Sequence, residues 1–221
     1  MRFSRVLVLP ALVPALISGC SSGPNFVAKL EPWRAQEENA CLQSGVLAHT
    51  TFAASRSALG GPSVCGTERP FELSAVNAGR VSIKPAALLR CPMIPQVERW
   101  IRESVSPAAR YYLGSEIVEV SIAGSYACRP MNHVSGAKLS EHGYANALDV
   151  SGFTLADGRK ISVKRDWNGA EVNQAYLRAV HRGACQYFTT VLGPDHDRAH
   201  NDHFHLDLAR HGKDGLKRIC K

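Results

Sequence analysis

The sequence lacks any apolar run that could cross a bilayer, any internal repeat and any long low-complexity tract. The apolar stretch at residues 6–17 has twelve residues and two prolines, whereas a transmembrane helix needs about 20 apolar residues. No cysteine lies in a Cys-x-x-Cys motif, which argues against a zinc ribbon or a thioredoxin-type redox site. No basic helix with interleaved aromatic residues is present, so we expect no nucleic-acid partner.

Length and composition are those of an ordinary globular protein. The 221 residues predict one domain with appendages or two small domains. A hydrophobic content of 45% and a charged content of 20% are compatible with a packed core. The formal net charge of +7 falls to +5 if Arg2 and Arg5 are removed with the N-terminal segment. This charge favours an anionic neighbour such as a cell-wall polymer or a membrane surface, but it serves general solubility equally well.

The N-terminus predicts export and lipid attachment. Residues 1–5 are basic, residues 6–17 are apolar, and Ile17-Ser-Gly-Cys20 places small residues directly before a cysteine. This pattern resembles a bacterial lipobox, which implies that Cys20 is lipidated and becomes the new N-terminus. The resemblance also implies an anchor on the periplasmic side of a bacterial membrane, and Ser21 favours the outer membrane. The alternative is a plain secretory signal with an incidental cysteine.

Six cysteines remain if Cys20 carries lipid, and an even number in an exported chain predicts disulfides. Six cysteines allow fifteen pairings. The simplest is sequential, with each bond closing a moderate loop and contributing about 3 kcal/mol to stability. The alternative is that some of the six are free buried thiols. The sequential pairs are Cys41–Cys65, Cys91–Cys128 and Cys185–Cys220.

The chain divides into four expected parts. A signal peptide covers residues 1–19, and a lipidated tether between lipid and fold covers residues 20–36. Residues 37–90 carry no chemical motif, and we interpret them as a disulfide-stapled N-terminal elaboration of the main domain. Residues 91–221 contain all the candidate catalytic and metal-binding side chains and form the expected catalytic domain.

Hydrophobic spacing predicts both helices and strands. In the N-terminal part we expect a short helix within 37–51, a loop at 52–70, and strands at 71–76 and 81–84. In the main part we expect a helix from Pro95 to Gly114, a strand at 116–122 that leaves Arg129 at a strand end, a strand at 145–150, a hairpin of 153–155 with 161–163, a helix at 172–192 and a strand from His203.

Two short segments, residues 140–149 and 200–207, carry the candidate chemistry. Together they offer neutral imidazoles and one carboxylate, and three such side chains with one open position describe a catalytic zinc site. Alternation along the later segment places its histidines on one face, with apolar residues behind them. The candidate zinc ligands are His142, Asp149 and His205, with His203 as the alternative to His205.

Hydrolysis at such a site needs further side chains. Zinc lowers the pKa of a bound water toward ~7, a carboxylate or imidazole accepts the proton, and a cation stabilises the oxyanion. Asp202 or His203 would be the base, with His200 in support. Arg129 would hold the oxyanion or a substrate carboxylate. We interpret His181 as structural or exposed, because nothing pairs it with these motifs.

The motifs resemble two groups of known proteins. Ser140-x-His142-x4-Ala147-x-Asp149 with a later His203-x-His205 resembles the zinc peptidases that cleave D-alanyl peptides of peptidoglycan, whose relatives include murein endopeptidases and the hedgehog signalling domain. The segments Ser-Tyr-x-Cys-Arg129 and His200-x-x-His203-x-His205-Leu-Asp resemble the bacterial extensin-like C-terminal domain family more closely, over about residues 37–220.

The resemblance implies an α+β fold in which a small antiparallel sheet lines a zinc cleft, with flanking helices and disulfide staples. It implies Zn²⁺ as the cofactor and peptidoglycan peptides as partners, beside the membrane that the lipid would reach. We expect a monomer. The implied roles are zinc ligation by His142, Asp149 and His205, catalysis by His200 and His203, and substrate binding by Arg129.

Two positions depart from the peptidase pattern. Ala145 stands where glycine is usual, and Asp202 stands where many relatives carry glutamate, one methylene longer. The favoured interpretation is a zinc-dependent hydrolase of amide bonds in peptidoglycan stems or cross-links, held on a membrane as a lipoprotein. The alternative is a zinc-containing wall-binding lipoprotein without catalysis, because a fold and its metal can persist without activity. A third interpretation places the histidines on the surface or in the core with no metal.

Overall fold

The computed structural model describes residues 24–47 and 51–221. The predicted signal peptide and the predicted lipidation site Cys20 lie outside these residues. Within the described ranges, no helix is both long enough and apolar enough to cross a membrane.

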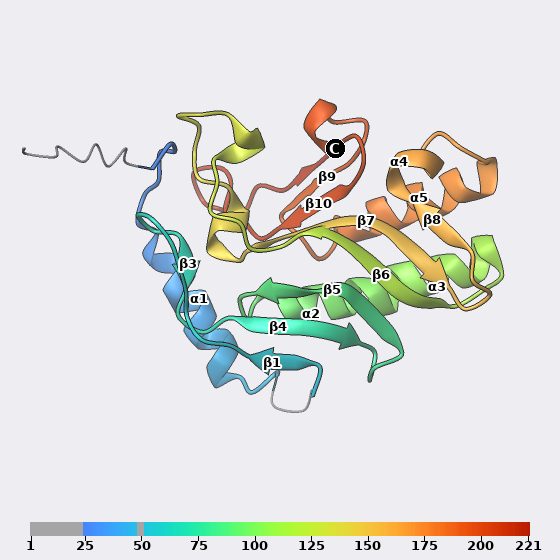
Figure 1. Cartoon of the computed structure of the whole chain (residues 1–221), viewed down its shortest axis with the longest axis horizontal. Helices are drawn as coiled ribbons and strands as arrows, with labels where there is room; N and C mark the ends of the chain where they lie inside the picture. Colours follow the sequence, from blue (N-terminus) through green and yellow to red (C-terminus); the bar gives the residue numbers. More distant parts are fainter. Residues whose placement is uncertain (1–23, 48–50) are drawn as a thin grey trace, which may run out of the picture.

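A nine-stranded mixed sheet forms the centre of the fold (Figure 1). The strands of the described residues are β1 (Ala53–Ser55), β2 (Leu59–Gly60), β3 (Gly66–Thr67), β4 (Phe71–Val76), β5 (Val81–Leu89), β6 (Ile117–Gly124), β7 (Ala147–Leu155), β8 (Lys160–Ser162), β9 (Thr190–Leu192), β10 (Phe204–Asp207) and β11 (Ile219–Cys220). The sheet order is β1-β4-β5-β6-β7-β10-β9-β11, and β8 pairs with the second half of β7. Only β5–β6 and β9–β11 are parallel pairs in this sheet. β2 and β3 form a separate small ladder.

The sheet is therefore larger than the small antiparallel sheet that we expected. Strands β1, β4 and β5 come from the N-terminal part of the chain, and they continue the same sheet that carries β7 and β10. The parallel pairing of β5 with β6 joins the two parts, and a helical crossover between these strands supplies the cover for one sheet face.

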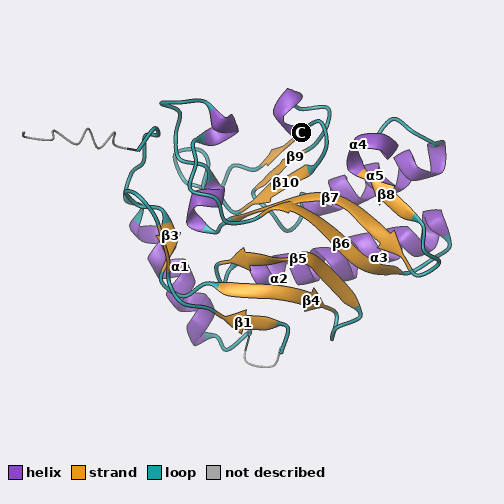
Figure 2. Ribbon diagram, viewed as in Figure 1, coloured by secondary structure: helices purple, strands orange, loops and turns teal. Residues whose placement is uncertain are grey.

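Helices cover that face (Figure 2). The longest helical stretch runs from Met93 to Leu113, and it ends where Gly114 takes a left-handed φ of 64°. Pro107 lies inside it, and because proline has no backbone N–H the flanking turns widen to π-helix. The helical elements are α1 (Pro32–Gln43), α2 (Met93–Trp100), η1 (Ile101–Val105), α3 (Ser106–Ala108), η2 (Ala109–Leu113), η3 (Met131–His133), η4 (Glu141–Tyr144), α4 (Val163–Asp166), α5 (Glu171–Ala184) and η5 (Arg198–His200).

The core lies between these helices and the sheet. Trp100 makes edge-to-face contacts with Phe153 and Phe188, at centroid distances of 6.3 and 6.1 Å, and its Nε1–H donates to the Val180 carbonyl at 3.1 Å. Helix α5 approaches the long helix closely at Gly183, where an added Cβ would lie 2.5 Å from the Ser104 Oγ. The helices are thus fixed against the sheet by large aromatic residues and one close backbone approach.

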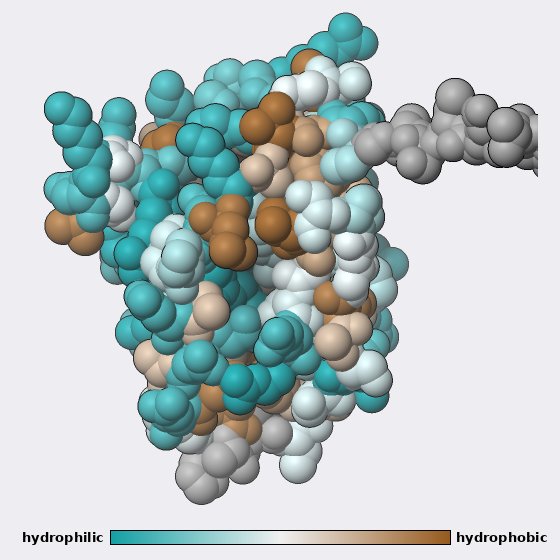
Figure 3. Space-filling model, turned by 90° about the vertical axis from the view of Figure 1, so that its left-hand side faces the viewer, coloured by the Kyte–Doolittle hydropathy of each residue, from teal (hydrophilic) through white to brown (hydrophobic). Residues whose placement is uncertain are grey.

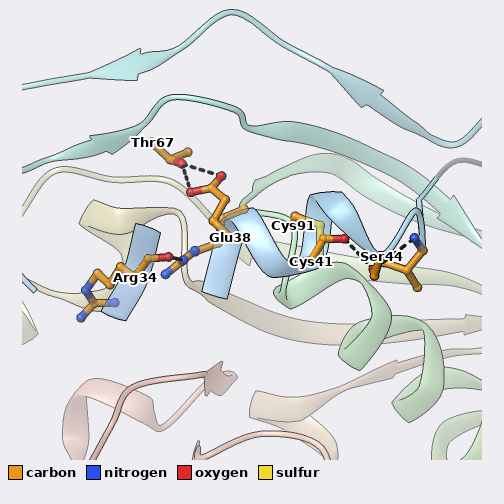
Figure 4. Close-up of a disulfide and its surroundings, with 8 residues drawn as sticks. Arg34, Glu38, Cys41, Ser44, Thr67 and Cys91 are labelled. Atoms are coloured by element: carbon orange, nitrogen blue, oxygen red, sulfur yellow. Dashed lines mark hydrogen bonds between the residues drawn. A yellow bond between two sulfur atoms is a disulfide. The ribbon is translucent and has the colours of Figure 1, made fainter. Parts of the chain in front are cut away.

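Three disulfides staple the domain, but only Cys185–Cys220 follows the sequential pairing. The sequential pairs Cys41–Cys65 and Cys91–Cys128 are wrong: the observed pairs are Cys41–Cys91 and Cys65–Cys128. The physical reason is the long-range packing of α1. This helix lies against the start of α2, so Cys41 meets Cys91, while Glu38 on the same helix accepts a hydrogen bond from Thr67 (Figure 4).

Several expected elements differ from those observed. The helix expected at 172–192 ends at Ala184, because residues 190–192 pair with β10 and β11 as strand β9. The loop expected at 52–70 contains β1, β2 and β3. The tether expected through residue 36 does not hold for residues 24–36, since α1 begins at Pro32 and Phe26 is buried. The helix ending at Gly114 and the strand at 71–76 are confirmed.

We expect peptide mapping to distinguish the two pairings directly. Digestion of oxidised, alkylated protein under non-reducing conditions should release linked peptides that contain Cys41 with Cys91 and Cys65 with Cys128. Mass spectrometry of these peptides before and after reduction makes the assignment. The Cys185–Cys220 peptide serves as an internal control, because both pairings share it. Linked Cys41–Cys65 peptides would contradict the placement of α1.

Candidate functional site

The register of two neighbouring strands builds the candidate site. β7 and β10 are antiparallel, and Asp149 stands directly opposite His205. Directly opposed residues project from the same face of a sheet, so the carboxylate and the imidazole meet without any help from a loop. On the other side, β6 ends with Gly124 opposite Asp149, and an added Cβ there would lie 3.1 Å from the Asp149 Oδ2. Gly124 therefore leaves the space that this carboxylate occupies.

His142 reaches the same place from η4, just before β7. The side chain of Ser140 caps this short helix by accepting the His142 N–H. Ala145 ends it with a left-handed φ of 53°, and it is fully buried. A glycine would adopt this conformation without strain, whereas left-handed backbone costs an alanine roughly 1–2 kcal/mol. The expected strand start at Ala145 is accordingly shifted to Ala147.

A half-buried ion pair fixes η4 against α1. Arg34 on α1 donates to both carboxylate oxygens of Glu141, with distances of 2.7 and 2.6 Å, and its guanidinium lies 3.8 Å from the centre of the Tyr144 ring. The Asn146 side-chain amide donates to the same carboxylate. A bidentate pair of this kind constrains orientation as well as distance. The N-terminal helix thus holds the loop that presents His142.

Two imidazole nitrogens and both oxygens of one carboxylate converge at the centre of the site. His142 Nε2 lies 3.0 Å from Asp149 Oδ2 and 3.2 Å from His205 Nδ1. His205 Nδ1 lies 2.9 Å from Asp149 Oδ1. All three side chains are buried, and these atoms form a group that could hold a metal ion. The structure therefore brings together the three residues predicted as ligands and selects His205 over His203 as the second histidine of this group.

The remaining nitrogen of each imidazole has its own partner. His142 Nδ1 lies 2.5 Å from the Ser125 carbonyl, which only a protonated nitrogen can approach as a donor. His205 Nε2 lies 2.9 Å from the Asp207 Oδ2, and Asp207 also accepts the Ala209 N–H. These contacts direct His142 Nε2 and His205 Nδ1 toward Asp149.

The sequence did not lead us to predict that Ser125 and Asp207 orient the two histidines. The Ser125 contact uses a backbone carbonyl, which leaves no trace in residue identity. Asp207 did carry a signal, because it alternates with His203 and His205 and so shares their strand face.

Electrostatics follow from this geometry in the metal-free protein. Burial alone would raise the pKa of Asp149, but hydrogen bonds from His142 and His205 outweigh it and hold the pKa well below its usual range. Burial alone would lower the pKa of His205, but hydrogen bonds to Asp149 and Asp207 outweigh it and raise the pKa to about 10. A metal ion would take the place of the proton on His205 Nδ1.

The three candidate base residues lie at the edge of this group. His203 Nδ1 is 2.9 Å from the Asp202 Oδ1, and His203 Nε2 is 3.5 Å from the Asp149 Oδ1. The His200 ring lies 5.4 Å from that of His203, between ring centres, and burial holds the His200 pKa below its usual value. All three predicted residues are therefore beside the site, and only Asp202 is substantially exposed, at 49% of its side chain.

A further aspartate orients His200. Asp197 Oδ1 lies 2.7 Å from His200 Nδ1, and the same carboxylate accepts the backbone N–H groups of Ala199 and His200 at the start of η5. With His196, these residues form a second group of donor atoms that could hold a metal. Because the Asp197 carboxylate already caps η5, its contacts are satisfied without a ligand.

We expected Arg129 at the end of a strand, and this prediction is wrong. Strand β6 ends at Gly124, and Arg129 follows five residues later in an irregular segment, next to Cys128, which is bonded to Cys65. Its guanidinium donates to the Pro130 carbonyl at 3.4 Å. Among the described residues, no hydrogen bond or ion pair joins it to His142, Asp149 or His205.

A pocket of about 420 Å³ lies along the sheet beside the site. Its floor includes Ser121 of β6 and Ser151 of β7, and one side includes Lys160 of β8. Asp202 also lines the pocket, and because it contacts His203 it connects the pocket to the candidate site. A β-bulge between β6 and β7 adds Ser151 and Gly152 to the open face while Phe153 stays in the core.

One family model matches this chain: the extensin-like protein C-terminus, over residues 39–221. The chain belongs to this family. The match starts within α1 and includes every strand of the sheet, all six disulfide cysteines, and every candidate catalytic and metal-binding residue. It confirms the resemblance to the extensin-like domain family. No curated protein and no solved structure shows significant similarity to the chain.

The raised pKa of His205 predicts a pH dependence of stability in metal-free protein. The unfolded imidazole titrates near pH ~6.5, so the stabilisation is complete below that pH and is lost as the pH rises through the folded value of about 10. After chelation, the free energy of unfolding should fall between pH 7 and 10 by a larger amount in wild type than in Asp207→Asn. Urea unfolding measures this difference, and equal slopes would contradict the assignment.

Proposed function

We propose that this extensin-like protein is a zinc-dependent hydrolase of amide bonds in peptidoglycan stems or cross-links, anchored by lipid on the periplasmic side of a bacterial membrane. The observation that carries the proposal is the convergence of His142, Asp149 and His205, each within 2.9–3.2 Å of the others and each imidazole held by a second partner. Such outer partners are typical of histidines that ligate a metal.

The donor set fits zinc. Two imidazole nitrogens and one carboxylate oxygen are ligands that zinc accepts, and three protein ligands leave a position for water or substrate. Ligand atoms of a tetrahedral site lie about 3.3 Å apart when the bond lengths are about 2.0–2.1 Å. His142 Nε2 and His205 Nδ1 lie 3.2 Å apart, slightly closer than this tetrahedral spacing. Each lies 2.9–3.0 Å from a different oxygen of Asp149, so small side-chain movements would admit the ion.

Zinc held there would supply Lewis acidity for the activation of water and the polarisation of a peptide carbonyl. The chain's own residues would then move the proton. His203 is the best-placed acceptor, because its Nδ1 donates to Asp202 and its Nε2 faces the Asp149 side of the site. Asp202 would orient His203, and His200, oriented by Asp197, would support the charge that develops nearby.

The adjoining pocket supports a peptide substrate. Its lining includes the hydroxyl residues Ser121 and Ser151 and the cations Lys160, Lys164 and Arg165, which outnumber the carboxylates Glu119 and Asp202. Stem peptides of peptidoglycan carry carboxylates, which lysines at this position would attract. Arg129 stays a candidate for binding a substrate carboxylate, although the only side-chain hydrogen bond that it forms within the described chain is to the Pro130 carbonyl.

Metal analysis tests the ligand set. We expect about one zinc per purified protein, bound by two histidines and one aspartate. The His142→Ala/His205→Ala double variant should lose the metal, whereas His133→Ala, which changes an exposed histidine, should retain it. Inductively coupled plasma mass spectrometry after dialysis measures both. Zinc retained in the double variant would remove the basis of the proposal.

Digestion of purified murein tests the reaction. Muropeptide profiles should change in a zinc-dependent way, and His203→Ala should reduce the rate by about 10²–10⁴-fold, as expected for loss of a general base. Asp202→Asn should cost less, because the amide can still contact His203. If Asp202→Asn abolishes turnover while His203→Ala does not, their roles are reversed.

The same experiment distinguishes a hydrolase from a second function, wall binding without catalysis. If zinc is bound but no muropeptide changes, the protein is a non-catalytic wall-binding lipoprotein. The observation that favours this alternative is the contact between Asp202 and His203. Asp202 stands where many of the similar peptidases carry glutamate, and its carboxylate is already engaged by His203. In that case murein should still pull down the protein, and Asp202→Ala should bind as wild type does.

A further inference from the structure

The described fold begins much closer to Cys20 than a tether of 20–36 allows. Phe26 is buried in a small apolar cluster with Leu139 and Tyr144. Val27 forms a bridge with Lys138, supported by backbone hydrogen bonds on both sides of the pair. The chain is thus already part of the domain within its first few described residues.

The short connection limits how far the domain can lie from a lipid anchor. Four residue steps separate Cys20 from Pro24, and an extended chain of that length spans at most about 14 Å. This argument rests on the lipid attachment included in the proposed function. Given that attachment, the side of the domain around residues 24–30 lies against the bilayer surface.

That side of the molecule exposes several apolar side chains. Two segments lie next to each other there, residues 24–30 and residues 130–138, joined by the Gly136 N–H to Asn25 carbonyl bond as well as the Val27 bridge. We call their exposed apolar side chains the anchor-side surface, and Figure 3 shows apolar side chains on this face. Its members and their exposed fractions are Val27 58%, Leu30 81%, Met131 49% and Val134 59%.

Two lysines lie on the same two segments. Lys29 and Lys138 are both exposed, and neither forms an ion pair within the described residues. Apolar side chains that enter the headgroup region and lysines that meet anionic lipids are the two components of peripheral membrane binding. A protein partner would need only the apolar residues, whereas lipid on Cys20, as the proposed function includes, would bring a bilayer to this surface through the short connection.

We propose that the anchor-side surface docks onto the anionic phospholipid bilayer that holds the lipid, so that the domain has a fixed face toward the membrane. The lipid supplies the attachment, and the four apolar side chains with the two lysines supply the orientation. The candidate site then keeps a constant position relative to the membrane, whatever reaction it performs.

The three disulfides allow a direct experiment. They use six of the seven cysteines, so in a chain that starts at Cys20 this residue carries the single free thiol. The chain 20–221 keeps every described residue, and its thiol can be coupled to a maleimide phospholipid in phosphatidylethanolamine–phosphatidylglycerol vesicles. The reference is the same chain capped with a small maleimide in solution. Hydrogen–deuterium exchange is then compared peptide by peptide.

We expect backbone amides in residues 24–31 and 130–138 to exchange at least about threefold more slowly on vesicles, with no change at β8 and α4. Leu30→Glu/Val134→Glu should remove this protection. The matched control is Tyr111→Glu/Val172→Glu, which changes two exposed apolar residues elsewhere, at 81% and 45% exposure, and should keep it. Equal exchange on and off vesicles, or protection that survives the first variant, overturns the proposal.

A separate measurement isolates the anchor itself. Mass spectrometry of the mature N-terminus from bacterial cells shows whether Cys20 carries lipid. A missing lipid with vesicle protection intact would reject the proposed localisation while leaving the membrane affinity of this surface established. A lipidated Cys20 without protection would reject the docking and leave the localisation standing.

Discussion

A charged carboxylate buried beside two imidazoles is the constraint around which this fold is arranged. Asp149 is 6% exposed, and an isolated carboxylate at that depth would be strongly destabilising. His142 and His205 offset this cost only if both stay within hydrogen-bonding distance, so their own positions must be held firmly. The register of β7 with β10 holds one histidine, and a loop fastened to α1 holds the other.

The N-terminal part of the chain therefore supports the site and holds its residues in position. Its strands extend the central sheet, and Arg34 pairs with Glu141, the residue before His142. The Cys41–Cys91 disulfide keeps α1 against the start of α2, and Cys65–Cys128 ties the β2–β3 region to the segment after β6. A part without chemical motifs thus supplies the rigidity that a buried, charged site requires.

Some of this could be predicted from the sequence because it depends on local pattern. The alternation of Phe204 and Leu206 with His203 and His205 places the histidines on one face, and β10 confirms this for His205, although the strand begins only at Phe204. Disulfide pairing and the sheet's size depend on packing between distant segments, which local pattern does not encode. Residues 190–192 read as a continuation of α5, since only the neighbouring strands make them a strand. The Ser125 carbonyl is equally invisible in residue identity.

The Arg34–Glu141 pair also has a mechanical meaning. A pull on the N-terminus would first separate the Val27 segment from Lys138 and then peel α1 away, until the covalent link at Cys41 stops it. Arg34 precedes that stop, so tension reaches Glu141 and the loop that carries His142. The pairing of β7 with β10 would not carry this tension. Stretching the chain would therefore displace one histidine and leave the opposite strand pair unchanged.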